Sequence, residues 1–250
     1  MHIYKKNFLN RVIARINFQP INSIRTSLDT NLSKTALELF PISEPKKELT
    51  GLKLQFSLKD ENIKREEVGK KAEWHYFGMN REKHLVIATD FMSVEYLKFD
   101  NFDNFIGDFF GIMEILFRAY KDVQVSQTAL RYINIINLEE DNPIDWNNYL
   151  NDNLLSIFNV PFDRNTISRA FQVLELNYGD MNLRFQYGMI NPDFPAVIRK
   201  KEFILDYDAF CSGLKTEIEI RDNINRFNLE IEKLFERCIK ANLKEIMNGN

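Results

Sequence analysis

The feature that most constrains the fold is a repeated change in apolar spacing along the chain. Residues 12–18 alternate apolar and more polar side chains, which is the period of a half-buried β-strand. Residues 102–120 instead place apolar side chains at every third or fourth position, which is one face of an α-helix. Because both periods recur in separate blocks, the sequence predicts an α+β protein.

Two blocks of the chain combine short strands with one long helix. Strand periods between residues 52 and 96 precede the helix at 102–120, and a predicted hairpin and strand between 171 and 210 precede a final helix from about Glu219. We therefore expect two antiparallel sheet-plus-long-helix halves, residues 1–160 and 161–250, which form a pseudo-repeat in one compact unit. A groove between two such layers is where ligands commonly bind.

Four further segments complete the expected organisation. A short helix is predicted near residues 28–40, and the charged run 59–71 is interpreted as a solvated hairpin connection. The run 130–136 is apolar on both faces and β-branched, as in a central strand. Residues 142–158 are expected to form a helix, because Asn142 can cap it and Pro143 suits its first position.

Composition excludes several classes of protein. The chain has 250 residues, 44% of them hydrophobic, and a net charge of -3, so composition alone predicts neither disorder nor bulk affinity for nucleic acids. Cys211 and Cys238 are too few for a disulfide scaffold and are expected to be free and buried. Neither a secretion signal nor a run of ~20 apolar residues occurs, so we expect a cytoplasmic protein without membrane contact.

No recognisable catalytic constellation is present in the sequence. It contains no G-x-G-x-x-G, no G-x-x-x-x-G-K-[ST] and no G-x-S-x-G motif, and no cofactor is predicted. His75 and His84 lie on neighbouring strands of a predicted hairpin, but no further ligand accompanies them, so a zinc site is rejected.

Asp206 and Asp208 are the candidate metal ligands. Two positions apart on a strand, their carboxylates share one face, with roughly 6.5–7 Å between the Cα atoms. This spacing suits Mg²⁺ or Mn²⁺ in a hydrolase. The alternative is a solvated pair at the end of a strand.

Polar residues inside the apolar strand 130–136 are the first candidates for binding. By the alternation of a strand, Arg131 lies on one face and Tyr132 and Asn134 on the other, and all three must find hydrogen-bond partners there or receive them from a ligand. Arg131 could clamp a phosphate or carboxylate, or form an internal salt bridge with Glu95 or Asp206.

The segment from Met1 to Leu28 carries basic residues and no acid. Lys5 and Lys6, with Arg11, Arg15 and Arg25, could contact nucleic acid or an acidic partner. The alternative is a solvated edge strand.

Several motifs in order along the chain resemble a sporadically distributed family of uncharacterised bacterial proteins of similar length. They are Trp74–Phe77, Asp90–Tyr96, Leu130–Asn134, Leu205–Asp208 and Phe235–Glu236. The resemblance implies a bacterial or archaeal cytoplasmic protein linked to mobile elements or defence systems, and it implies no activity. Trp74, Arg131, Tyr132, Asn134, Asp206 and Asp208 occupy the motif positions, whereas Asn228 stands where a histidine is expected.

The resulting functional prediction is a non-enzymatic interaction subunit of accessory, inhibitory or antitoxin type in a defence or mobile-element system. Its many Phe and Tyr residues suit interface anchors as well as a core, so a protein partner is expected and a homodimer is an alternative. Two other functions stay open. They are a nucleotide or nucleic-acid sensor that uses Arg131 and the basic segment, and the metal-dependent hydrolase described above. Trp74 is a further candidate binding residue.

Overall fold

Strands from the whole length of the chain join in one antiparallel sheet. The computed structural model describes residues 4–56, 63–159, 161 and 163–249, with the backbone alone for 51–56 and 63–69. The strands are β1 (Leu9–Phe18), β2 (Ile42–Ser43), β3 (Lys47–Phe56), β4 (Ile63–Phe77), β5 (Lys83–Ala88), β6 (Phe91–Tyr96), β7 (Val125–Leu138), β8 (Ala170–Asn177), β9 (Asn182–Met189) and β10 (Lys201–Lys215).

In the described part of the chain, four α-helices and three 3₁₀ helices accompany the sheet. The elements are η1 (Asn22–Arg25), α1 (Thr30–Leu39), α2 (Phe102–Ala119), η2 (Asp152–Phe158), η3 (Arg164–Thr166), α3 (Glu217–Cys238) and α4 (Ala241–Asn248). None of these helices in the described part of the chain is both long and apolar enough to span a membrane.

The strand order corrects the expectation of two separate layers. The sheet runs β2-β4-β5-β6-β1-β7-β10-β9-β8, with β3 paired to β4. A meander on each side thus ends beside a central strand, β6 beside β1 and β10 beside β7. The α+β class is confirmed, but both halves share one sheet, and the pseudo-repeat is not confirmed.

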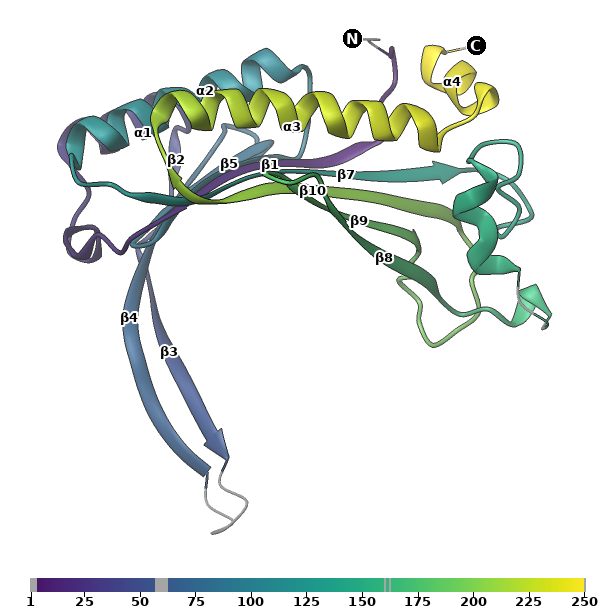
Figure 1. Cartoon of the computed structure of the whole chain (residues 1–250), viewed down its shortest axis with the longest axis horizontal. Coiled ribbons are helices and arrows are strands. Elements are labelled where there is room, and N and C mark those ends of the chain that lie inside the picture. Colours follow the sequence, from purple (N-terminus) through teal and green to yellow (C-terminus); the bar gives the residue numbers. More distant parts are fainter. Residues whose placement is uncertain (1–3, 57–62, 160, 162, 250) are drawn as a thin grey trace.

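The helices α1, α2 and α3 all cover the same face of this sheet (Figure 1). On β1, Val12, Ala14 and Ile16 are fully buried toward the helices, whereas the residues between them are half-buried on the opposite face. Alternation of this kind is what one covered face requires, because successive side chains of a strand point to opposite sides. Among the described residues, no helix covers the second face.

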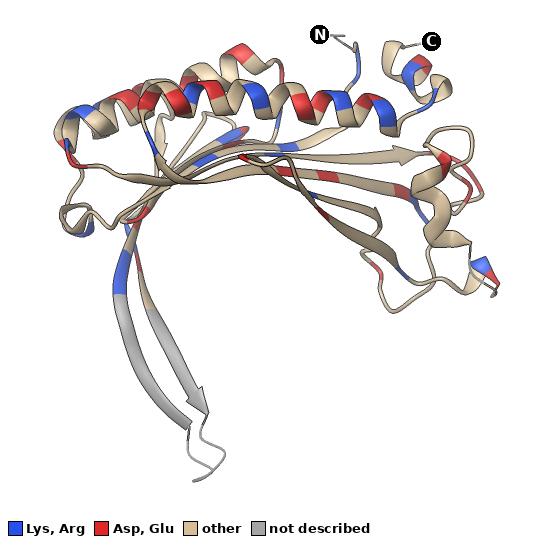
Figure 2. Cartoon of the chain, viewed as in Figure 1, with Lys and Arg blue, Asp and Glu red and all other residues tan. Residues whose placement is uncertain are grey.

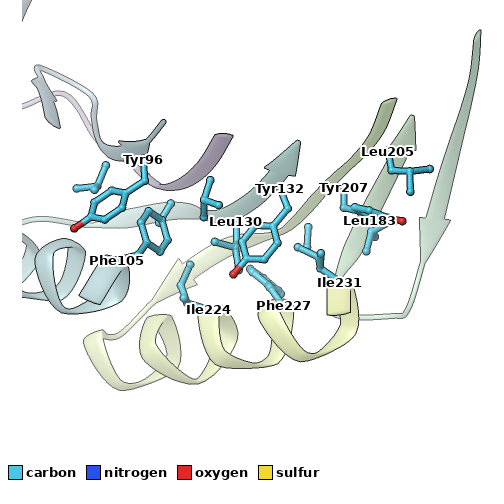
Figure 3. Close-up of a cluster of buried hydrophobic side chains, with 14 of the residues drawn as sticks. Tyr96, Phe105, Leu130, Tyr132, Leu183, Leu205, Tyr207, Ile224, Phe227 and Ile231 are labelled. Atoms are coloured by element: carbon cyan, nitrogen blue, oxygen red, sulfur yellow. The ribbon is translucent and has the colours of Figure 1, made fainter. Parts of the chain in front are cut away.

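Helix α3 supplies most of the cover over β7 and β10. Thr216 and Glu219 form a capping box at its start, which satisfies backbone N–H groups that lack an intrahelical partner. Ile220, Ile224, Phe227 and Ile231 form its buried stripe. Figure 3 shows Ile224, Phe227 and Ile231 facing Leu130 and Tyr132 of β7. The predicted single final helix is interrupted at Ile239, which is extended and bridges to Leu150.

The helix predicted for residues 142–158 is wrong. Turns and η2 occupy this range, and the side chains of Asn142, Asp145 and Asn151 accept hydrogen bonds from backbone N–H groups two residues later. Such bonds offer the backbone an alternative to the helix. The apolar stripe is nevertheless buried, with Trp146 and Leu150 inaccessible to solvent.

The loop predicted over the charged run 59–71 is also wrong in large part. β4 begins at Ile63 and pairs with β3, and the two strands leave the sheet as a long arm (Figure 1). Residues 59–62 of the run lie outside the described residues. Ladder hydrogen bonds join backbone groups, so a charged sequence does not prevent strand pairing.

Other predictions are confirmed. The β4–β5–β6 meander, the β8–β9 hairpin and a central strand at 130–136 are all present. The helices predicted near 28–40 and at 102–120 are present as α1 and α2, and they are capped by Asp29 and Asn101. Cys211 and Cys238 are free and buried.

Replacing Phe227 tests how far α3 holds the sheet together. Because its side chain is fully buried, Phe227→Ala should lower the free energy of unfolding by about 3–5 kcal/mol, as other large core truncations do. Leu229→Ala, on the exposed side of the same helix, should cost within about 0.5 kcal/mol. Urea denaturation measures both, and equal losses would contradict this account of the core.

Candidate functional site

The predicted binding residues of β7 lie on two different faces of the sheet. Arg131 points to the uncovered face, whereas Tyr132 and Asn134 are buried toward α3. The alternation of the strand predicted this division. The three residues therefore cannot act in one site.

Arg131 is occupied by an internal partner. Its Nε and Nη2 lie 2.9 and 2.6 Å from Oδ1 and Oδ2 of Asp206, a bidentate ion pair. This hydrogen bonding raises the pKa of Arg131 further. The salt-bridge alternative with Asp206 is present, and it leaves the guanidinium less available to an external anion.

Asp206 and Asp208 share the uncovered face, as predicted. The carboxylate of Asp208 makes no hydrogen bond or ion pair with the described residues, and burial raises its pKa, an effect that nearby Arg131 opposes. Within the described ranges, no three His, Cys, Asp or Glu side chains are grouped closely enough to hold a metal ion. The metal site therefore stays a prediction without a third ligand.

His75 and His84 lie side by side on this face, with 3.0 Å between Nδ1 of His75 and Nε2 of His84. Glu73 contacts His75, Glu95 lies beside His84, and Arg11 pairs with Glu95. Burial lowers the pKa of His75, with smaller contributions from neighbouring positive groups. The cluster forms a row of mutually satisfied polar groups across four strands.

Trp74 and the basic segment have local partners. Nε1 of Trp74 donates to the carbonyl oxygen of Ile24 at 3.0 Å, which fixes η1 to β4. Lys5 and Lys6 are exposed, and the backbone N–H of Lys6 donates to Met247 of α4. The edge-strand alternative is wrong, because β1 lies between β6 and β7.

The remaining arginines of the segment do not extend a surface from Lys5 and Lys6. Arg11 pairs with Glu95, and the guanidinium of Arg15 lies 3.8 Å from the centre of the Phe91 ring on the uncovered face. Positive and negative residues are interspersed along α3 as well (Figure 2). A continuous basic stripe of the kind that binds nucleic acid is therefore not formed by these residues.

A pocket of about 280 Å³ lies between the C-terminal half of α3, the start of β1 and the start of α2. Its walls combine aromatic rings with carboxylates. The lining residues are Tyr4, Asn7, Leu9, Phe99, Asp100, Asn101, Phe102, Asp103, Tyr132, Asn134, Ile231, Glu232, Phe235, Glu236 and Met247. Tyr132 and Asn134 of the predicted site thus contribute to it.

A chain of polar groups lies at the inner side of this pocket. The hydroxyl of Tyr132 donates to Oδ1 of Asn228 at 2.5 Å, and Figure 3 shows the tyrosine pointing from β7 toward α3. Burial raises the pKa of Glu232, and a hydrogen bond from Asn228 opposes this. Oε1 of Glu232 is buried without a hydrogen-bond partner among the described residues.

Sequence reasoning missed Glu232 and the surrounding acids. The available signal was the spacing of Asn228 and Glu232. They are four residues apart on one side of α3, and each directly follows a residue of the apolar stripe, Phe227 or Ile231. The residues before β1 also line the pocket. The sequence could not show this, because it depends on the folded contact between the segment before β1 and α4.

The second candidate surface is the last strand of the sheet. β8 pairs with β9, and no other described strand pairs with β8. Phe171, Val173 and Leu174 expose 37, 50 and 44% of their surface, on both faces of the strand. Exposed apolar residues on a free edge are a template for strand pairing with another chain.

Gly188 of β9 determines how closely β8 can approach. It has a φ of +134°, and a Cβ at this position would lie 2.2 Å from the carbonyl oxygen of Ala170. A residue other than glycine would separate the start of β8 from the sheet.

Comparison with known proteins adds no assignment. No protein-family model matches the sequence, and no curated protein matches it.

The ion pair between Arg131 and Asp206 should contribute measurably to stability. Arg131→Met leaves a carboxylate whose side chain is only 8% exposed, so it should cost about 2–3 kcal/mol. Arg184→Met removes a similar pair with Glu175 in which both side chains are about half exposed, and should cost below about 1 kcal/mol. Equal urea midpoints for the two variants would contradict a structural role for Arg131.

Asp208 should make stability depend on pH with a defined sign. Its pKa is raised in the folded state, so between the unfolded value of about 3.9 and the raised folded value the native state binds more protons and loses stability as pH rises. Asp208→Asn should therefore gain stability relative to wild type across this window and keep the gain at neutral pH. Urea midpoints from pH 3 to 8 measure the difference, and a gain confined to low pH would contradict the sign.

Proposed function

We propose that this chain is a protein-binding subunit without catalytic activity of its own, and that it accepts an extended segment of a partner along β8. The observation that carries the proposal is a free sheet edge with exposed apolar side chains on both faces. Addition of a strand to such an edge is a common mode of peptide recognition.

The backbone of β8 offers a regular set of outward hydrogen-bonding groups. The N–H of Tyr178 donates to the carbonyl oxygen of Met181 at 2.8 Å, so this pair is hydrogen-bonded at the turn of the hairpin. Hydrogen-bonded and non-bonded pairs alternate along an antiparallel ladder. The N–H and C=O groups of Phe171, Val173 and Glu175 therefore point away from β9.

The side chains around this edge support specific association. Tyr178, Ile190, Phe194 and Val197 are also exposed, and they belong to the segments that follow β8 and β9. An incoming strand would place its own apolar side chains beside Phe171 and Val173 on one face and beside Leu174 on the other. Exposed apolar patches of this kind mark interaction sites.

The other functions predicted from the sequence receive less support. A sensor that clamps an anion with Arg131 must first displace Asp206, and Arg11 and Arg15 of the basic segment already contact Glu95 and Phe91. A hydrolase built on Asp206 and Asp208 needs a further ligand, which the described residues do not supply.

A peptide library can test strand addition directly. We expect the purified chain to select extended peptides, and Val173→Pro to weaken their binding more than tenfold, because proline removes an outward N–H without affecting the bonds to β9. Val173→Lys is a second variant, which leaves the backbone unchanged. Leu229→Lys, with the same 50% exposure on α3, is the matched control and should bind normally.

Hydrogen exchange of the complex identifies the binding edge. Bound peptide should slow exchange of the amides of Phe171, Val173 and Glu175 more than that of other exposed amides. Binding that neither Val173 variant changes would refute the use of β8. The chain alone could instead form a dimer that Val173→Pro dissociates. In that case the partner strand would come from a second copy of this chain.

A further inference from the structure

The pocket beside α3 has an unusual combination of side chains. Its described lining contains five aromatic residues and four carboxylates, and no Lys, Arg or His. A pocket for phosphates or other anions would need the opposite charges, since such ligands are bound by Arg, Lys or clustered N–H groups. The chemistry of the walls instead favours a positive ligand.

One oxygen of the Glu232 carboxylate lacks a hydrogen-bond partner among the described residues. Oε1 of Glu232 is buried and accepts no hydrogen bond from the described residues, which is costly for a carboxylate. Glu236 differs, because the hydroxyl of Tyr4 donates to it at 2.6 Å and Lys244 lies 2.7 Å away. Glu232 is therefore the acid that a bound donor would satisfy.

The aromatic walls suit a cation with an apolar body. Phe99 and Phe235 are half-buried beside the opening, and the ring of Phe99 lies 6.0 Å from that of Tyr132. Aromatic faces attract ammonium and guanidinium groups, and the attraction is stronger where these groups are desolvated. Apolar wall area also favours the rest of such a ligand.

The exposed rim adds long-range attraction. Asp100 and Asp103 flank Asn101, the cap of α2, and both are exposed at the edge of the pocket. Charges of one sign around an opening raise the local concentration of the opposite ion. The volume of about 280 Å³ lies at the lower end of ligand sites, which limits the occupant to a small molecule or a single side chain.

We propose that this pocket binds a small organic monocation, an ammonium or guanidinium on an aromatic or branched apolar body, with the positive group held by Glu232. Asn228 positions Glu232, since its side chain lies between the carboxylate and the hydroxyl of Tyr132. This site is independent of β8 and does not rest on the protein-binding function.

Three probes of similar shape and different charge test the proposal. They are 2-phenylethylamine, 2-phenylethanol and 3-phenylpropanoate, titrated into the full chain by calorimetry. The amine should bind at least tenfold more tightly than the alcohol, and the carboxylate should not bind. Equal affinity for all three would overturn the proposal.

A matched pair of variants locates the charge that matters. Glu232→Gln keeps the shape of the side chain and should remove the preference for the amine over the alcohol. Glu230→Gln removes the same charge two residues away on α3, outside the pocket, and should leave that preference unchanged. A preference that survives Glu232→Gln, or is lost equally in both variants, would refute the role of Glu232.

A third readout does not depend on substitution. The methyl resonance of Met247, which lines the pocket, should shift with the amine in wild-type protein, whereas the buried Met92 on β6 should not. A shift of neither methionine despite binding would place the amine elsewhere. A fourth probe, N-acetyl-lysine methylamide, represents a lysine side chain of a partner protein. It should bind as the amine does if the positive group belongs to a protein, and a failure to bind would restrict the site to free small molecules.

Discussion

Burial on one face of the sheet is the constraint on which the rest of the structure depends. Along β1, β7 and β10, every second side chain is sealed beneath the helices, and the residues between them face outward. A slip of one residue in β7 would exchange its two sets and bury Arg131 in place of Tyr132. Both the ion pair on the open face and the polar chain beneath α3 therefore follow from a single register.

The sequence predicted local elements well and their assembly poorly. Periods of two and of about four residues located most strands and helices, because they depend on neighbours within a turn or a pleat. The range 142–158 failed because Asn and Asp side chains bind the nearby backbone, although Trp146 and Leu150 are buried as their spacing predicted. The joining of both halves in one sheet depends on contacts between distant segments, which no local pattern encodes.

The candidate sites show the same division. Alternation correctly assigned Arg131 and Tyr132 to opposite faces, and Asp206 was one of two expected partners of Arg131. The pocket could not be predicted, because residues from the start of the chain, from α2 and from the end of α3 meet there only after folding. The edge position of β8 could not be predicted either. Nothing in the sequence of residues 170–177 distinguishes a strand at the edge of a sheet from one in its middle.

The strand order also has a consequence for how the chain reaches its native state. The meanders β4–β5–β6 and β8–β9–β10 join neighbours in the sequence, whereas β7 must find β1 and β10, which lie far away on either side of it. Non-local pairings of this kind slow folding because long loops must close first. During synthesis, β7 lacks one neighbouring strand and the cover of α3 until β10 and α3, at residues 201–238, have also been made, so the nascent chain exposes this strand to incorrect pairing in the interval.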